Sequence, residues 1–395
     1  MAAPVLKTRT GGFIRFIILV VLLTPLWLYI AWLLTEKRKL VVAIVDKTVL
    51  NKKGQEHVSI NWILNQEKFT KNRKELYNRE KDYYGFFPLD DQQFQIKGLE
   101  RFNNHRLEQL SKDVDLVYLT DTYGVYKNEW YHENTDSTVT GILYGGMSRQ
   151  DLYFIKQMQA RHKLIITEFN CLATPTHPAV RTSFEKTFGI HWTKWIGRYF
   201  SSLDITSNPD LPRWLTDLYR KKNNGDWPFR KSGIVLVNTD DDVLILENNT
   251  HLKQDLPLII SGKEEQQYYG LPASIPYSFW FDVIVPDSSR NRVLSSFKIA
   301  VNEAGEKLLA AHNLQPTFPA ITAHVSSDYR FFYFSADFSD NPLSLSSSYF
   351  KKIAWFKMFL YNRRDPLDRS SFFWNLYQPM VTRILDDYYK TIQQH

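Results

Sequence analysis

The sequence predicts an α/β protein in which helices sandwich a mostly parallel sheet, with an added antiparallel β portion and one preceding transmembrane helix. Three observations lead to this prediction. Short apolar runs alternate with a helical pattern, closely spaced apolar runs follow within residues 230–300, and a run of 19 uncharged residues lies near the N-terminus. Strands that alternate with helices form βαβ units, which favour parallel pairing.

The uncharged run covers residues 16–34 and nearly spans a hydrocarbon core of roughly 30 Å at about 1.5 Å per residue. We expect a transmembrane helix over residues 13–34 within an N-terminal anchor, residues 1–39. This pattern indicates a signal-anchor in a single-pass membrane protein, with the lipid bilayer as partner and the body on the extracytoplasmic side. A cleaved signal peptide is the alternative, but the run exceeds the usual apolar length of about 7–15 residues and no small-x-small site follows.

The first half of the body alternates between strand and helix patterns. Residues 40–45, 114–120 and 164–167 are continuous apolar runs, as expected for strands that are buried on both faces. Residues 148–161 lie between the second and third run, begin with a serine three residues before an aspartate, and keep helical spacing. These elements predict the parallel part of the sheet.

The second half begins with closely spaced apolar runs at residues 233–238, 243–247 and 257–260. Their short connections predict a hairpin within a β insertion over residues 230–300. Further strands are expected at residues 279–285, 295–301, 320–325 and 330–336, and helices at residues 349–361 and 371–392. The predicted body therefore covers residues 40–345, and residues 346–395 form a C-terminal helical tail.

Composition argues against several classes of protein. The 395 residues carry 49 Lys and Arg against 42 Asp and Glu, a net charge of +7. Residues 1–39 hold six of these cations and one acid, so they contribute +5 and the rest of the chain only +2. This distribution indicates no nucleic-acid surface. A single cysteine excludes an internal disulfide, and the chain has no H-E-x-x-H, G-x-G-x-x-G or G-K-[ST] motif, so we expect no metal and no cofactor.

Acidic residues directly follow the strands that we expect in the sheet. Asp46, Asp121, Glu168 and Asp337 each come at the end of such a strand, and Asp340 follows three residues after the last. Ligands bind beyond the carboxyl ends of parallel strands, where these acids would converge. Asp121, Glu168 and Asp337 are candidate catalytic residues, since carboxyl groups with separated pKa values suit general acid–base chemistry. Ordinary turn residues are the alternative.

Other side chains near these strand ends are candidates for ligand binding: Asp46, His57, Asn170, Cys171, Arg198, Tyr199 and Asp340. Cys171 follows a predicted strand, but no glycine flanks it, so a buried and inert cysteine is the alternative to a nucleophile. Aromatic residues make up 15% of the chain and mix with charges over residues 81–88, 192–200 and 329–338. Such blocks are typical of sugar-binding surfaces or of packed cores.

Three segments carry a resemblance to a known family: residues 115–124 (DLVYLTDTYG), 145–170 (GGMSRQDLYFIKQMQARHKLIITEFN) and 329–340 (YRFFYFSADFSD). A strand, a GG turn with a helix, and a strand that ends at an elbow resemble the class I glutamine amidotransferase-like superfamily. This resemblance implies a flavodoxin-like α/β fold. The chain is also similar to membrane-anchored bacterial proteins, which implies no mechanism.

Catalytic members of this family carry a G-x-C-x-G elbow and a late His-x-Glu pair. Residues 169–173 of this chain read FNCLA, and His324-Val-Ser326 lacks the glutamate. The resemblance therefore implies a divergent domain that lacks glutaminase activity.

Three functions fit these observations. The first is a membrane-anchored amidotransferase-like domain that binds a ligand or partner, such as a polysaccharide or a membrane protein, in the bacterial cell envelope. The second is a hydrolase or transferase that uses the strand-end carboxylates. The third is a structural scaffold that offers its C-terminal helix to a partner. Convergence of the acids in one pocket would favour the second function over the third.

Overall fold

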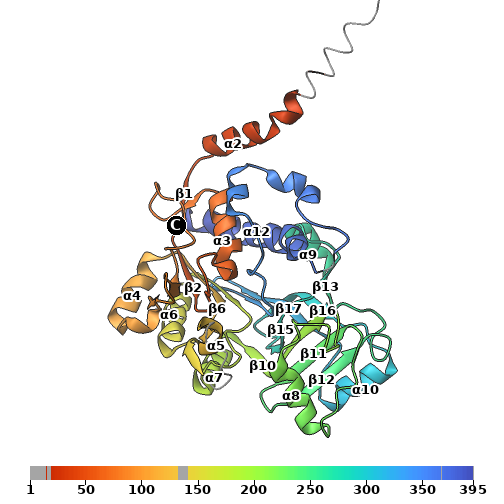
Figure 1. Cartoon of the computed structure of the whole chain (residues 1–395). Coiled ribbons are helices and arrows are strands. Elements are labelled where there is room, and N and C mark those ends of the chain that lie inside the picture. Colours follow the sequence, from red (N-terminus) through yellow and green to blue (C-terminus); the bar gives the residue numbers. More distant parts are fainter. Residues whose placement is uncertain (1–14, 16–18, 132–140, 366, 395) are drawn as a thin grey trace, which may run out of the picture.

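The structure, a computed structural model, describes residues 15, 19–131, 141–365 and 367–394, and its centre is a ten-stranded sheet (Figure 1). In spatial order the strands of this sheet are β14 (Ser274–Pro276), β13 (Leu258–Ser261), β16 (Arg292–Lys298), β17 (Thr317–Val325), β18 (Arg330–Phe334), β9 (Leu164–Glu168), β6 (Leu116–Asp121), β2 (Val42–Asp46), β4 (Tyr84–Pro88) and β5 (Phe94–Ile96). The chain is therefore an α/β protein.

The sheet is mixed. Strands β18, β9, β6, β2 and β4 are parallel at its centre, and every pairing outside them is antiparallel. The predicted mostly parallel sheet is therefore wrong. The reason is the length of chain between strands, because only residues 326–329 separate β17 from β18. A parallel pair needs a crossover of about a dozen residues or more, so this connection forms a hairpin.

Antiparallel strands also form a separate sheet, whose strands in spatial order are β12 (Val243–Glu247), β11 (Gly233–Asn238), β10 (Ile190–Phe200) and β15 (Phe281–Pro286). The pairing of β11 with β12 confirms the hairpin predicted within residues 230–300. Two further pairs join β1 (Arg38–Lys39) to β3 (Phe69–Thr70) and β7 (Val125–Tyr126) to β8 (Ile142–Tyr144).

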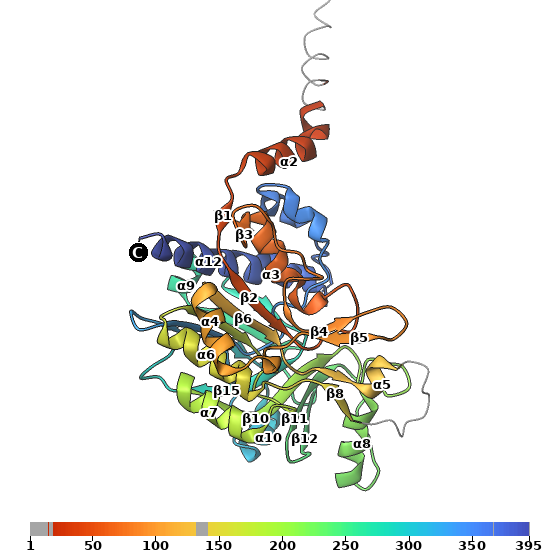
Figure 2. The ribbon, with the colours of Figure 1, turned by 90° about the vertical axis from the view of Figure 1, so that its left-hand side faces the viewer.

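Helices cover both faces of the parallel strands (Figure 2). One face carries α4 (Asn104–Asp113), α6 (Arg149–Ala160) and α7 (Pro178–Phe188), and the other carries α3 (Gln55–Gln66) and α12 (Gln378–Ile392). The remaining helices are α5 (Lys127–Trp130), α8 (Arg213–Lys222), α9 (Lys263–Tyr269), α10 (Glu303–Ala311), α11 (Arg369–Phe372), η1 (Leu99–Arg101), η2 (Leu345–Tyr349), η3 (Ile353–Phe359) and η4 (Phe373–Tyr377).

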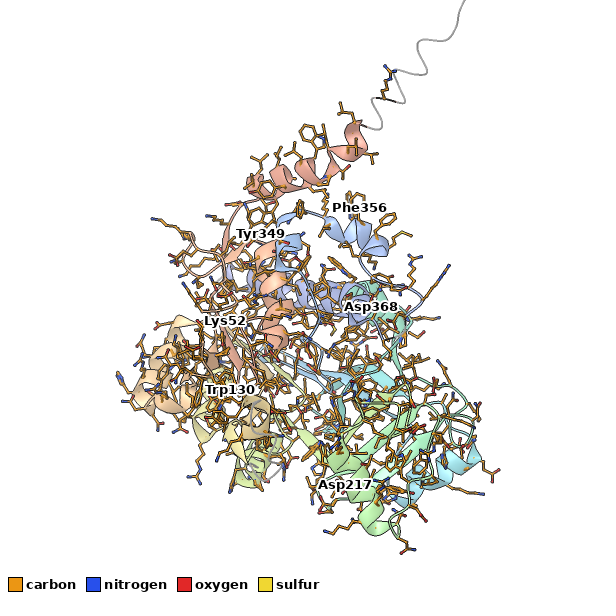
Figure 3. All side chains as sticks on the ribbon, in the orientation of Figure 1. Lys52, Trp130, Asp217, Tyr349, Phe356 and Asp368 are labelled. Atoms are coloured by element: carbon orange, nitrogen blue, oxygen red, sulfur yellow. The ribbon has the colours of Figure 1, made fainter. Side chains whose placement is uncertain are left out.

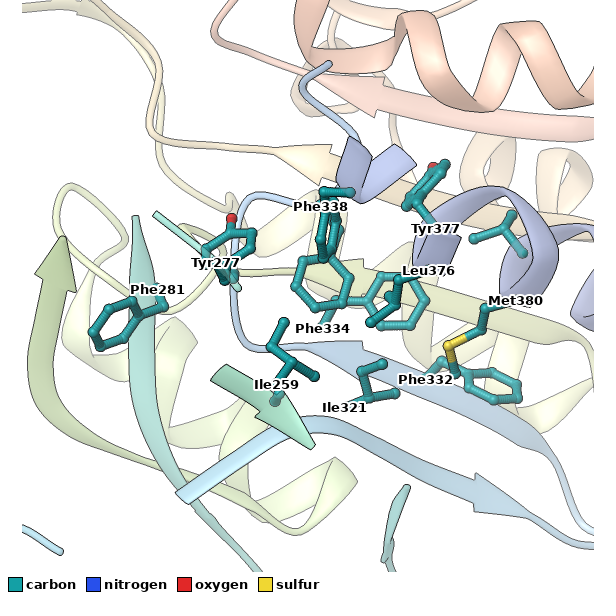
Figure 4. Packing of buried hydrophobic residues seen from close by; sticks show 14 of the residues in the cluster. Ile259, Tyr277, Phe281, Ile321, Phe332, Phe334, Phe338, Leu376, Tyr377 and Met380 are labelled. Carbon is teal, nitrogen blue, oxygen red and sulfur yellow. The ribbon is translucent and has the colours of Figure 1, made fainter. Parts of the chain in front are cut away.

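Two apolar cores lie on opposite faces of the parallel strands. Val42 and Ile44 belong to the core that α3 and α12 cover, whereas Ala43 and Val45 belong to the core beneath α6. This division follows from the alternation of side chains along a strand. Figure 4 shows Met380 in the first core with residues of the neighbouring strands. Because both cores are apolar, polar side chains of these strands gather at the strand ends.

The predicted transmembrane helix over residues 13–34 is contradicted. The helix α2 (Thr24–Leu34) has 11 residues and a length of about 16 Å, about half of a hydrocarbon core. Within the part of the chain that the structure describes, no helix is long and apolar enough to span a membrane. Residues 13, 14 and 16–18 of the predicted span lie outside the described residues. The predictions of a single-pass membrane protein and of a signal-anchor depended on this helix, so they are contradicted as well.

Two local features explain why α2 differs from the predicted transmembrane helix. Pro25 lacks the N–H that an uninterrupted helix would use, and a turn at Leu23 separates α2 from the helical residues 19–22. Trp32, expected at a lipid interface, is buried in the body, where its indole N–H donates to the Asn65 carbonyl at 3.0 Å. Hydropathy alone does not distinguish a residue that faces lipid from one that docks on protein.

The C-terminal region begins with a short element. The sequence predicts a helix over residues 349–361, but only the 3-10 helix η3 (Ile353–Phe359) lies within this range. The preceding 3-10 helix, η2, ends at Tyr349. The helix predicted over residues 371–392 is confirmed as α11, the π-helical turn η4 and α12 in succession. The predicted boundaries of the body and tail stay predictions.

Candidate functional site

The ends of the parallel strands bring acidic residues together, as the sequence predicts. Asp46 ends β2 and Asp121 ends β6, and the two residues are register partners in this parallel pair. The loop after β18 adds Asp337 and Asp340. Charge interactions connect both loop residues to Glu56 or Asp121. We call Asp46, Glu56, Asp121, Asp337 and Asp340 the strand-end cluster.

Asp121 has the environment of an acid–base group. Its Oδ1 accepts the Tyr123 N–H at 2.6 Å, and its Oδ2 accepts the side-chain amide of Asn170 at 3.3 Å. Burial, and next the charge of Asp46, raise the pKa of Asp121 to about 7. The carboxyl group is therefore divided between its protonated and ionised forms near neutral pH, and can both donate and accept a proton.

Asp46 forms a buried pair with His57. The Nδ1 of His57 lies 2.5 Å from Asp46 Oδ2, and its Nε2 lies 2.8 Å from the Arg79 carbonyl oxygen. A carbonyl oxygen only accepts, so Nε2 donates to it. Both ring nitrogens are occupied, so His57 orients Asp46 and is not a free base.

Glu56 is a member of the cluster that the sequence interpretation missed. It lies in the first turn of α3, directly after the loop that follows β2. Burial raises its pKa well above the usual range, and the charges of Asp46, Asp340 and Asp121 raise it further. The pattern that could have revealed it is an acid in the first turn of the helix that follows a strand-end acid.

Arg369 neutralises the two acids of the loop after β18. Its Nη1 lies 3.0 Å from Asp340 Oδ2 and 3.4 Å from Asp337 Oδ2, and its Nη2 donates to the Asp337 carbonyl at 2.7 Å. Burial raises the pKa of Asp337 well above its usual range, while Arg369 opposes this effect. Gln55 donates to Asp340 at 2.5 Å. Neither Arg369 nor Gln55 was predicted from the sequence.

Glu168 lies beneath the cluster and has no exposed surface. Its Oε2 accepts the backbone N–H groups of Phe338 and Ser339 at 2.9 and 3.0 Å and the Ser339 hydroxyl at 3.1 Å, and its Oε1 accepts the Tyr118 hydroxyl. Burial raises its pKa to about 8 despite these donors. Glu168 therefore ties the end of β9 to the loop after β18, which positions Asp337 and Asp340.

Cys171 and Asn170 form the turn after β9. The Cys171 side chain is completely buried, and burial, followed by the charge of Asp121, raises the pKa of its thiol well above the usual value. A nucleophilic cysteine requires the opposite shift. Asn170 adopts a left-handed conformation with φ of 64°, which asparagine tolerates, and turns its amide toward Asp121.

Arg198 and Tyr199 are adjacent on β10 and point to opposite faces, so only one of them can face the cluster. Arg198 is half-buried beside Trp280, 5.8 Å from its ring centroid, and among the described residues its Nε has no hydrogen-bond partner. Burial lowers the pKa of Arg198, and the positive charge of Arg369 contributes to this shift. Tyr199 instead donates to Asp255 at 2.8 Å, away from the cluster.

Two cavities lie beside residues that contact the strand-end cluster, and none of the five acids is among the described residues that line either cavity. One has a volume of about 240 Å³ and is lined by His57 and Tyr83 among others. The other has a volume of about 230 Å³ and is lined by Arg369 and Phe279. In the part of the chain that the structure describes, no three His, Cys, Asp or Glu side chains are placed to hold a metal ion.

Comparisons with known proteins show only distant similarity. No family model matches the chain, and no curated protein matches it. Among solved structures, a β-galactosidase from Bacillus circulans sp. alkalophilus is 11% identical with a TM-score of 0.34 over 80% of this chain and 31% of its own. A ThuA-like protein from Bacteroides uniformis is 10% identical with a TM-score of 0.31 over 75% of this chain and 82% of its own. None of these similarities identifies the family of the chain.

Proposed function

We propose that this chain is an amidotransferase-like domain without glutaminase activity that binds a neutral, hydroxyl-rich ligand at the strand-end cluster. One observation carries the proposal. Five acidic side chains from four segments are held at the carboxyl ends of the parallel strands, and the pKa values of Glu56, Asp121 and Asp337 are all raised. Gathering carboxyl groups in this way destabilises the ionised folded state, and such arrangements concentrate at functional sites.

The chemistry of the cluster suits hydroxyl groups. Ionised carboxylates and the Asn170 carbonyl oxygen accept hydrogen bonds, whereas protonated Asp121 and the guanidinium of Arg369 donate them. A sugar offers both donors and acceptors on one small ring. Oligosaccharides of the bacterial cell envelope are therefore the class of ligand that we propose.

The absence of glutaminase activity is supported by Cys171. A thiol with no exposed surface, held protonated by burial and by Asp121, cannot attack a substrate amide. The full chain is therefore expected to release no ammonia from glutamine. Ammonia release that disappears in a Cys171→Ser variant would contradict this part of the proposal.

Calorimetric titration of the full chain with neutral envelope oligosaccharides tests the ligand. We expect binding to weaken in Asp121→Asn and Glu56→Gln variants, because each replaces a carboxyl group of the proposed binding cluster. Asp90→Asn is the matched control, since the Asp90 side chain is 84% exposed and pairs with Lys52 on the surface. No binding to any oligosaccharide class, or equal binding by all variants, would refute the proposal.

Acid–base catalysis by Asp121 is a second candidate function, which its pKa of about 7 specifically favours. In a hydrolase or transferase, Asp121 would exchange a proton with the ligand while Arg369 stabilises negative charge. The test is turnover of chromogenic glycosides and esters as a function of pH. Turnover that depends on a group titrating near pH 7 and is lost in Asp121→Asn supports it, and equal rates in both proteins exclude it.

A further inference from the structure

An exposed apolar surface lies at the end of the molecule that carries α2, where Figure 3 labels Phe356. It is formed by η3, in which no residue is buried. Trp355 and Phe359 are 71% and 81% exposed, and Phe356 and Met358 are 38% and 50% exposed. We call these four side chains the η3 surface. Large apolar side chains that gather on a surface mark a site of interaction.

The η3 surface is held in position by its neighbours. Ile353, Ala354 and Leu360 pack against the apolar core that α3 and α12 cover, so η3 is anchored on its inner side. The preceding segment is joined to α2, because the Lys351 N–H donates to the Leu28 carbonyl at 3.0 Å. The helix α2, which this bond joins to the segment, also exposes apolar side chains, namely Leu26, Trp27, Leu33 and Leu34.

The segment that carries the η3 surface is rich in positive charge. Residues 341–364 contain five Lys and Arg residues and no acid. Lys351 pairs with Glu67 at 3.2 Å, and the Nζ of Lys352 lies 4.4 Å from the ring centroid of Trp355. Among the described residues, the other four cations of this segment have no ion-pair partner, namely Lys352, Lys357, Arg363 and Arg364. These cations are available to attract an anionic partner.

We propose that the η3 surface rests on a lipid surface with anionic headgroups. Tryptophan and phenylalanine insert at the boundary between headgroups and acyl chains, and neighbouring lysine and arginine side chains attract anionic lipids. The two observations are independent, since exposed rings alone would fit many partners and the cations select an anionic one. Contact with the surface of a bilayer requires no helix that crosses it. This proposal does not depend on the ligand of the strand-end cluster.

Flotation of the full chain with lipid vesicles tests the proposal. Vesicles of phosphatidylcholine mixed with phosphatidylserine are expected to bind the protein, and vesicles of phosphatidylcholine alone to bind it more weakly. A Trp355→Ser/Phe359→Ser variant is expected to lose at least about tenfold in affinity. In a variant without the charges of Lys352 and Lys357, each lost cation weakens binding by about fivefold.

Trp214→Ser is the matched control, because Trp214 is 49% exposed on α8 at the opposite end of the molecule (Figure 1). The control is expected to bind vesicles as the wild type does. None of the variants changes a buried side chain, so unchanged thermal unfolding confirms that each is folded. Equal binding by wild type and the Trp355→Ser/Phe359→Ser variant overturns the proposal, even if α2 itself binds lipid. Equal binding to both kinds of vesicle, or self-association that the same variant abolishes, also overturns it.

Discussion

Replacing Asp121 with asparagine is expected to remove a pH-dependent loss of stability. Burial, and next Asp46, raise the pKa of Asp121 from 3.8 to about 7. The difference of about 3 corresponds to about 4 kcal/mol. Between these two values the folded state binds more protons than the unfolded state, so the free energy of unfolding falls as the pH rises from about 4 to about 7. Above pH 7 the loss is complete.

The asparagine side chain does not titrate and keeps the size of the aspartate. Its Oδ1 can still accept the Tyr123 N–H, and the amide of Asn170 can turn its oxygen toward the new Nδ2. The wild type is expected to lose about 2.5 kcal/mol more than the variant between about pH 5 and about pH 8. Asp121→Asn should therefore be the more stable protein at the higher pH.

Urea unfolding followed by tryptophan fluorescence at both pH values measures this difference. The Asp90→Asn variant serves as the control, since its exposed carboxyl group should leave the pH dependence of the wild type unchanged. If wild type and Asp121→Asn lose equal stability between the two pH values, the pKa of Asp121 is not raised in the folded protein. The acid–base role proposed for Asp121 would then lose its basis.

Three further variants test the surroundings of the cluster. Lys47→Met leaves Asp151 buried without its partner at 2.6 Å and should lower the unfolding free energy by about 3–5 kcal/mol in urea, whereas adding Asp151→Asn should restore part of it. Gly85→Ala should lower the melting temperature far more than Gly225→Ala, because both residues have positive φ but only at Gly85 would a Cβ meet a backbone oxygen of β2, at 1.5 Å. Glu168→Gln replaces one acceptor oxygen with an NH₂ group and should lower thermal stability by about 1–3 kcal/mol without changing the surface of the cluster. A Glu168→Gln protein as stable as the wild type would contradict the hydrogen bonds assigned to Glu168.

The strands that carry the cluster were predictable from the sequence. The runs at residues 40–45, 114–120 and 164–167 are apolar because both of their faces pack against helices, and each run ends where the chain reaches the sheet edge. The position of an acid directly after such a run predicts its place at that edge. The convergence of Asp46 and Asp121 follows from parallel pairing, which βαβ alternation favours.

Other members of the cluster could not be predicted in this way. Glu56 belongs to a helix and Arg369 lies more than 200 residues after Asp121, so only the packing of α3 and α11 against the strand ends places them there. Partners separated by long stretches of chain leave no periodic pattern. Glu168 was predicted as a catalytic residue because it follows a strand. In the structure its carboxyl group instead accepts hydrogen bonds from the loop after β18.

The sequence by itself determined the local elements: the buried parallel strands, the hairpin of β11 and β12, and the acids at the strand ends, since each depends on a short pattern of apolar and polar residues. Only the tertiary structure decided the direction of the outer strands, the docking of Trp32 on the body, and which charges meet at the sheet edge. The physical reason is that burial and charge pairing depend on residues far apart in the chain. Hydropathy near the N-terminus therefore predicted a membrane span, while the structure shows α2 as a short helix whose Trp32 packs on the protein.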